Sequence, residues 1–242
     1  FPEGMGWWLD DHDPNLPQVG DRLLEHLVAI GTPILFCHKG LSNNTRFGSP
    51  MDVGPAAARP PAVSFVIYHS GCEAGTREGP YTDATANLGV NRLIASLRQA
   101  GIRPGSNVYA ELGSTWWHLL RRPDEAAHVI GKLLLAFGED NILWGTDSIF
   151  YGSPQGQIEA FRAFQIPRAM REEFGYAELT DRAKAKILGW NAARLYDIEP
   201  ITQPVGFTTE DLELARIEHP VPTRPWGPTT RREVREFRLH HQ

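Results

Sequence analysis

Four short apolar segments, separated by stretches with helical spacing, constrain the fold of this chain more than any other feature. The segments are residues 33–38, 62–69, 107–112 and 141–147. Each is rich in β-branched or aromatic residues and is bounded by residues that favour turns. Short and almost continuously apolar runs are typical of strands that are buried on both faces of a parallel sheet. We therefore predict four parallel strands.

Helical patterns lie between and after these segments. Apolar residues recur at helical spacing over 19–30 and 83–100, and 123–137 begins with proline and acidic residues and ends at a glycine. Residues 154–164 and 181–188 also have helical patterns. Alternation of strand and helix predicts an α/β fold with a parallel sheet. Neither a G-x-G-x-x-G nor a Walker A sequence follows any predicted strand, which argues against dinucleotide and P-loop folds.

The last part of the chain differs in composition from the rest. Residues 201–242 include HPVPTRPWGPTTRREV, which is rich in proline and arginine and has no clean periodicity. We therefore divide the chain into a body, residues 1–200, and a tail, residues 201–242. We expect the tail to be extended and to wrap the body or an oligomer partner, with a partly disordered end as the alternative.

Composition narrows the classes of partner and compartment. The net charge is −5 at pH 7, so no basic excess favours nucleic acid or an anionic membrane. No apolar run approaches the roughly 20 residues that span a bilayer. Two cysteines are too few for a disulfide framework, so a reducing, cytoplasmic location is expected. The chain opens as the middle of a loop would, and we expect the natural sequence to continue upstream.

Side chains that can bind metal or transfer protons stand at the end of each predicted strand. They are His38, His69, Glu111 and Asp147. Because the loops after parallel strands open on one face of a sheet, these side chains are expected to meet there. Imidazole and carboxylate groups together suit a divalent metal, above all zinc, which can activate a bound water as a nucleophile. Each residue also has a structural alternative, such as a core histidine, an arginine partner for Glu111 or a helix cap for Asp147.

Two neighbours of His38 are expected to point elsewhere. Because successive side chains alternate across a strand, Cys37 should face the covering helices as a packed thiol. Lys39 should also leave the strand in a different direction from His38. Its side chain is predicted either to contact substrate or to be solvated.

Several of these stretches resemble the amidohydrolase-related superfamily of metal-dependent hydrolases, in the branch that also holds non-oxidative decarboxylases. The stretches are CHKG, VIYHSG, NVYAELG, ILWGTDSIFYGSPQGQIEAFRAFQIP and KILGWNAARLY, and the resemblance covers residues 7–198. It implies a (β/α)8 TIM barrel with a metal at its C-terminal mouth, of which about the last four βα units are present. It also implies that His38 binds metal, that His69 is a ligand or a proton shuttle, and that Asp147 binds metal and orients water.

The chain also departs from the pattern of that superfamily. It has no His-x-His pair, which the superfamily carries on its first strand, and it lacks material for the first four strands. Glu111 falls on the seventh strand, where the superfamily has no universal catalytic residue. Glu111 and Lys39 are therefore considered only as residues that contact the substrate or support the metal ligands.

Three functional hypotheses follow from the residues and the resemblance. The first is hydrolysis of an amide, ester or lactone by metal-activated water, with a small molecule as substrate and zinc as the expected metal. The second is metal-dependent, non-oxidative decarboxylation of an aromatic or enoic acid. The third is a non-catalytic assembly module or an inactive fragment. A homo-oligomer is compatible with each of them.

Overall fold

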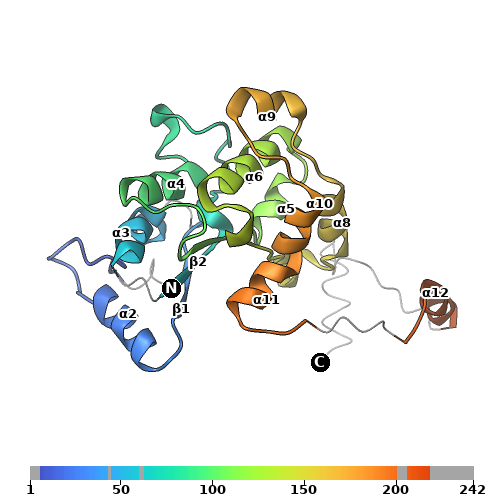
Figure 1. Cartoon of the computed structure of the whole chain (residues 1–242), viewed down its shortest axis with the longest axis horizontal. Helices are drawn as coiled ribbons and strands as arrows, with labels where there is room; N and C mark the ends of the chain where they lie inside the picture. Colours follow the sequence, from blue (N-terminus) through green and yellow to red (C-terminus); the bar gives the residue numbers. More distant parts are fainter. Residues whose placement is uncertain (1–5, 43–44, 60–62, 201–205, 219–242) are drawn as a thin grey trace, which may run out of the picture.

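Four parallel strands form the sheet of this protein (Figure 1). A computed structural model describes residues 6–42, 45–59, 63–200 and 206–218. The strands are β1 (Ile34–His38), β2 (Ser64–Tyr68), β3 (Val108–Glu111) and β4 (Ile142–Leu143), in the order β1-β2-β3-β4. A mixed α/β fold with a parallel sheet is thus confirmed, and this sheet is compatible with part of a TIM barrel.

The register of the strands explains the alternation of buried and open positions. A row of small and apolar side chains runs across the sheet on the face that the helices cover, formed by Cys37, Ile67, Ala110 and Ile142. Cys37 is buried as a free thiol, as predicted. On β1, His38 is the next residue along the strand and therefore points to the other face.

Strand β4 is shorter than the segment 141–147 that the sequence predicts. Asn141 ends a short 3₁₀ turn (η5, Glu139–Asn141), and only Ile142 and Leu143 pair with β3. The chain then leaves the sheet and reaches Asp147 in a left-handed conformation, with φ of 50°. The apolar residues of segment 141–147 therefore indicate where the chain is buried, but strand pairing with β3 ends at Leu143.

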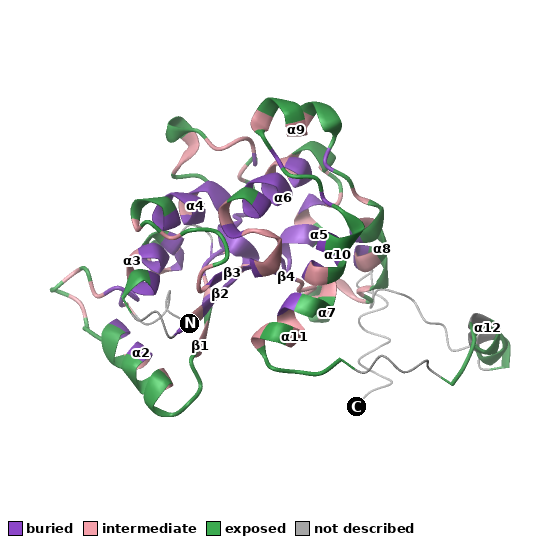
Figure 2. Cartoon of the chain, in the orientation of Figure 1, coloured by how far each residue is buried: buried purple, intermediate pink, exposed green. Residues whose placement is uncertain are grey.

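Helices cover one face of the sheet. Helix α2 (Gly20–Ala29) contacts β1, α3 (Val53–Ala58) contacts β2, and α6 (Pro123–Phe137) contacts β3 and β4. Helix α4 (Val90–Gln99) packs on α3. Figure 2 shows buried residues concentrated on β2 and β3 and on parts of α3, α4 and α6.

Two predicted helices have different bounds in the structure. The segment 83–100 becomes a 3₁₀ turn (η4, Asp83–Thr85) followed by α4, which begins only after Gly89 because that glycine has φ of 47°. The segment 181–188 extends further than expected, through α10 (Asp181–Ala185), a π-helical turn (η6, Lys186–Trp190) and α11 (Asn191–Leu195).

Shorter helices complete the body and part of the tail. Helices α5 (Thr115–Leu119) and α7 (Ser148–Tyr151) follow β3 and β4, and α8 (Gln155–Ala163) and α9 (Arg168–Phe174) come next. Helix α12 (Thr209–Glu218) lies within the part of the chain that the sequence assigns to the tail. Residues 201–205 and 219–242 of the predicted tail lie outside the described residues. Within the described ranges, no helix combines the length and apolar character needed to cross a membrane.

Candidate active site

Two histidines meet at the carboxyl ends of β1 and β2. His38 is the last residue of β1, and His69 directly follows β2 in a 3₁₀ turn (η3, His69–Gly71). Their Nε2 atoms lie 3.0 Å apart, and the rings meet edge to face with centroids 4.7 Å apart. The structure therefore brings together the first two of the four side chains that the sequence singles out.

The loop after β3 fixes the orientation of His69. Nδ1 of His69 lies 2.7 Å from the carbonyl oxygen of Gly113, which can only accept a hydrogen bond, so Nδ1 carries the proton. The hydroxyl of Thr115 donates to the His69 carbonyl oxygen at 2.8 Å. Burial, reinforced by nearby His38, lowers the pKa of His69 below its ordinary value. The neutral ring thus turns the lone pair of Nε2 toward His38.

The backbone of His69 is held in an uncommon conformation. His69 and Ser70 have φ of 63° and 52°, in the left-handed region that non-glycine residues rarely adopt. Gly40, in the loop after β1, packs so closely on this turn that an added Cβ would lie 2.9 Å from Cβ of His69. Backbone in such regions persists only where the surrounding structure determines it, and it is concentrated at functional sites.

Glu111 supports this turn from behind. Its Oε2 accepts a hydrogen bond from the backbone N–H of His69 at 3.2 Å, and its Oε1 accepts one from Gly113 at 2.7 Å. Burial raises the pKa of Glu111 to about 7. The nearby Gly145 leaves no room for a side chain, since an added Cβ would lie 1.5 Å from Oε1 of Glu111. Both carboxylate oxygens of Glu111 therefore bind backbone amides at the site.

Asp147 approaches His69 from a different side than His38 does. Oδ2 of Asp147 lies 3.6 Å from Nδ1 of His69, whereas His38 meets that ring at Nε2. The Asp147 side chain makes no capping hydrogen bond to α7, although it precedes that helix. It instead accepts a short hydrogen bond from the hydroxyl of Ser114, which in turn accepts one from the hydroxyl of Tyr151 at 2.9 Å.

The donor set fits a divalent metal in part. Two imidazoles and a carboxylate are the donor types that zinc prefers, and the facing Nε2 atoms of His38 and His69 suit a shared cation. In the part of the chain that the structure describes, however, no three His, Cys, Asp or Glu side chains are grouped as a metal site would require. His38 and His69 are thus placed as a pair, with Asp147 beside them.

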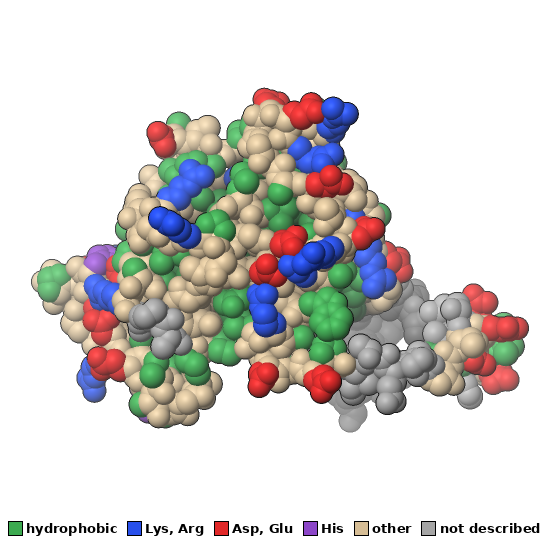
Figure 3. Space-filling model, viewed as in Figure 1, with side chains coloured by type: hydrophobic (Ala, Val, Ile, Leu, Met, Phe, Trp, Pro, Cys, Tyr) green, Lys and Arg blue, Asp and Glu red, His purple; other side chains and the backbone are tan. Residues whose placement is uncertain are grey.

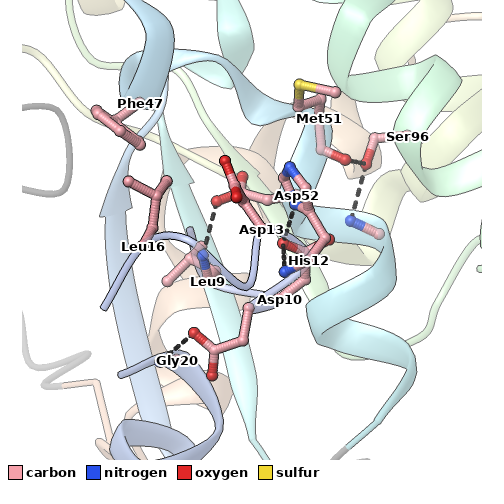
Figure 4. A network of polar contacts seen from close by, with 12 residues as sticks. Leu9, Asp10, His12, Asp13, Leu16, Gly20, Phe47, Met51, Asp52 and Ser96 are labelled. Carbon is pink, nitrogen blue, oxygen red and sulfur yellow. Dashed lines mark hydrogen bonds and ion pairs between the residues drawn. The ribbon is translucent and has the colours of Figure 1, made fainter. Parts of the chain in front are cut away.

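The prediction that Lys39 is solvated is wrong. Its ammonium group is completely buried, and Nζ donates hydrogen bonds of 2.8 Å to Oδ2 of Asp52 and to the carbonyl oxygen of Phe47. Asp52 also accepts a hydrogen bond of 2.9 Å from the backbone N–H of Leu9 (Figure 4). Burial raises the pKa of Asp52 although the Lys39 charge opposes this change. Lys39 is thus engaged in the core and has no surface open to a substrate.

Aromatic residues near the site fall into two groups. Trp116 is buried, donates from Nε1 to the carbonyl oxygen of Gln157 at 3.0 Å, and packs on Phe161. Trp117 instead stacks on Tyr151 with ring centroids 4.1 Å apart and an interplanar angle of 13°. This second pair lies next to Asp147, because the Tyr151 hydroxyl is bonded to Ser114.

Surface charge and one cavity were compared with the strand ends. Over the described surface of the face in Figure 3, basic and acidic side chains lie next to one another. A cavity of about 730 Å³ lies beside η6 and α11, lined by Trp190, Tyr196 and their neighbours, and it does not include His38, His69 or Asp147. We therefore regard the strand ends as the candidate active site.

Sequence reasoning missed the supporting residues Ser114, Asp52 and Gly113. Each acts through a tertiary contact that no local pattern announces, and Ser114 in particular lies 33 positions before the aspartate it binds. The only local signal was the short Leu-Gly-Ser segment directly after β3.

The sequence of this chain was compared with curated proteins and with models of protein families. A search of curated proteins found no match. The family model described as Amidohydrolase matches residues 1–198. This family supports metal-dependent hydrolase or lyase chemistry in general. The chain therefore belongs to the amidohydrolase family.

Proposed function

We propose that His38, His69 and Asp147 form part of a metal-dependent hydrolase site that acts on the carbonyl group of an amide, ester or lactone. The observation that carries this proposal is the 3.0 Å approach of the two Nε2 atoms, together with the bond that keeps the proton of His69 on Nδ1. A histidine ligand of a metal commonly donates its other ring N–H to a carbonyl or carboxylate in this way.

Each residue has a distinct proposed role. His38, His69 and Asp147 hold a divalent metal, with zinc expected from the donor types. Such a metal, when bound, polarises a carbonyl group and lowers the pKa of bound water. Asp147 accepts the proton of the attacking water, and its carboxylate is already oriented by Ser114. Proton transfer by His69 to the developing charge is the alternative to its role as a ligand.

Glu111 is proposed to support His69 without touching the substrate. Both of its carboxylate oxygens are engaged by backbone amides, and its carboxyl group is nearly buried. These bonds hold the turn in which His69 has its left-handed conformation.

A second candidate function is decarboxylation of an aromatic acid. The stacked Trp117–Tyr151 pair favours it, because this pair presents a flat apolar surface next to Asp147. A non-catalytic assembly module is the third candidate.

Metal analysis of the purified chain tests the site. We expect bound zinc to fall in His38→Ala and in Asp147→Ala, and to be retained in His26→Ala, which replaces an exposed histidine on α2. Metal content that neither His38→Ala nor Asp147→Ala changes would refute the metal-ligand assignment.

Product analysis tests the reaction. A panel of lactones, amides and aromatic acids separates the candidates: hydrolysis of the first two supports the hydrolase, and release of carbon dioxide from the acids supports the lyase. A protein that binds zinc through His38 and Asp147 but turns over none of them would favour the non-catalytic module.

A further inference from the structure

We propose that Ser114 and Tyr151 are positioning residues that orient the Asp147 carboxylate and thereby set the metal affinity of the site. This inference rests on the proposed function, because it assumes that Asp147 contributes to metal binding. It assigns a role to two hydroxyl groups on the loops that follow β3 and β4.

The direction of the hydrogen bonds is fixed by the chemistry of the three groups. The Asp147 carboxylate can only accept, so the single hydroxyl proton of Ser114 is donated to Oδ2. Because its single proton is used in this way, the Ser114 oxygen can only accept a further hydrogen bond, and the Tyr151 hydroxyl donates one to it at 2.9 Å. The result is an ordered chain from Tyr151 through Ser114 to Asp147.

The Ser114 hydroxyl serves Asp147 and not the helix that begins next to it. Ser114 precedes α5, yet its side chain makes no capping bond to that helix. It is 3% exposed, so bulk water does not compete strongly for the hydroxyl. Ser114 and Asp147 both have left-handed backbones, with φ of 52° and 50°. Two such unfavourable conformations in contact indicate that the surrounding structure determines this arrangement.

The ring of Tyr151 is held independently of its hydroxyl. It stacks on Trp117 of α5 with centroids 4.1 Å apart. The stack joins α5 to α7, and the hydroxyl chain joins the same two loops a second time. Tyr151→Phe therefore removes one hydrogen bond and leaves the aromatic packing in place.

Loss of this support would release Asp147. Its side chain is 32% exposed, and Oδ2 lies 3.6 Å from Nδ1 of His69. Without the Ser114 hydroxyl, the carboxylate can rotate toward solvent and away from the histidines. Replacing an outer hydrogen-bond partner of a metal ligand typically lowers metal affinity about 10–100-fold.

The test is a zinc titration in competition with a chromophoric chelator. We expect Ser114→Ala to bind zinc about 10–100-fold more weakly than wild type and Tyr151→Phe to show a smaller loss of the same sign. Tyr81→Phe is the matched control, because the Tyr81 ring packs on Arg98 of α4 and not on the loops after β3 and β4, and it should bind zinc as wild type does. Ser114→Gly relieves the left-handed backbone while removing the hydroxyl, so weaker binding with undiminished stability would exclude a folding defect.

A double-mutant cycle decides whether Ser114 acts through Asp147. In the Asp147→Asn background, Ser114→Ala is expected to cause no further loss of zinc affinity. An equal loss in both backgrounds would overturn the inference, and so would wild-type affinity in Ser114→Ala while Asp147→Asn is weakened. In that last case the proposed function stands. Wild-type affinity in both His38→Ala and Asp147→Asn would refute the proposed function, and the inference with it.

Discussion

Nζ of Lys39 lies 2.8 Å from Oδ2 of Asp52, and neither side chain has any exposed surface. This buried ion pair begins one residue after His38 and ends in a 3₁₀ turn (η2, Pro50–Asp52). Asp52 also accepts the backbone N–H of Leu9, so the pair joins the first described segment to the end of β1. The position of His38 thus depends on a charge pair inside the core.

Removing only the cation of this pair should strongly destabilise the protein. Lys39→Met leaves a buried carboxylate without its partner, which typically lowers the free energy of unfolding by about 3–5 kcal/mol. The double variant Lys39→Met/Asp52→Asn removes both charges and keeps an acceptor for Leu9, so it should recover much of the loss. Urea unfolding followed by circular dichroism measures both. A loss of about 1 kcal/mol or less, as for an exposed pair, would contradict the structure.

A side chain at Gly145 should disturb the support of His69. An alanine Cβ there would lie 1.5 Å from Oε1 of Glu111, whose carboxylate is held by two backbone amides. We expect Gly145→Ala to lower the free energy of unfolding by about 1–3 kcal/mol, as overpacking does. Gly156→Ala on α8 is the control, because an added Cβ meets nothing within 4 Å there. That substitution should be neutral or stabilising by up to about 1 kcal/mol. Equal effects would argue against the close approach of Gly145 to Glu111.

Both thiols should be inert in the folded protein. Burial raises the pKa of Cys37 and of Cys72 to about 12, so almost no thiolate is present near neutral pH. We expect a thiol reagent such as DTNB to react slowly with the native protein. The same reagent should titrate both cysteines rapidly once urea has unfolded it. Rapid reaction of one thiol in the native protein would show that its side chain is accessible.

His128 should make stability fall in mildly acidic solution. Burial, followed by the charge of Lys132, lowers its folded-state pKa below 6.5, and Nδ1 lies 2.9 Å from the hydroxyl of Tyr176. The unfolded chain therefore takes up this proton at higher pH than the folded chain does. The contribution of neutral His128 is complete above its unfolded pKa, and it decreases as the pH falls from there toward the folded pKa.

Thermal unfolding between about pH 8 and pH 5 tests this contribution. His128→Gln should flatten the decrease in Tm that wild type shows below about pH 6.5. His26→Gln, at an exposed position on α2, should retain it. A wild-type slope that persists in His128→Gln would assign the pH dependence to other groups.

Local sequence patterns predicted the strands, because a buried strand forms a run of consecutive apolar residues. All four strands lie within their predicted segments, and α6 has the bounds 123–137 that its proline and glycine indicate. His38 and His69 are neighbours because they stand at the ends of adjacent parallel strands, whereas Asp147 reaches His69 from the segment that follows β4. The early end of β4 was not predictable from its apolar run. Pairing stops at Leu143, and Gly145 then passes close to the Glu111 carboxylate, a tertiary contact that the run does not reveal.

The partners of polar residues were beyond local reasoning. Lys39 looked solvated because lysine usually is, and only the fold reveals Asp52, 13 positions later, inside the same core. The same applies to Ser114 and Asp147, which belong to loops after different strands. Such pairs depend on the tertiary arrangement of the loops, and residue type alone does not specify it.

The bond from His69 to the carbonyl of Gly113 also has a consequence for synthesis of the protein. The two residues are 44 positions apart, so a nascent chain that has emerged only through η3 contains both histidines but not the group that orients one of them. Because chains are synthesised from the amino terminus, an early segment cannot form its tertiary contacts until the later segments have been made. The orientation of the His69 ring would therefore be fixed only after β3 has docked, at a late stage of folding.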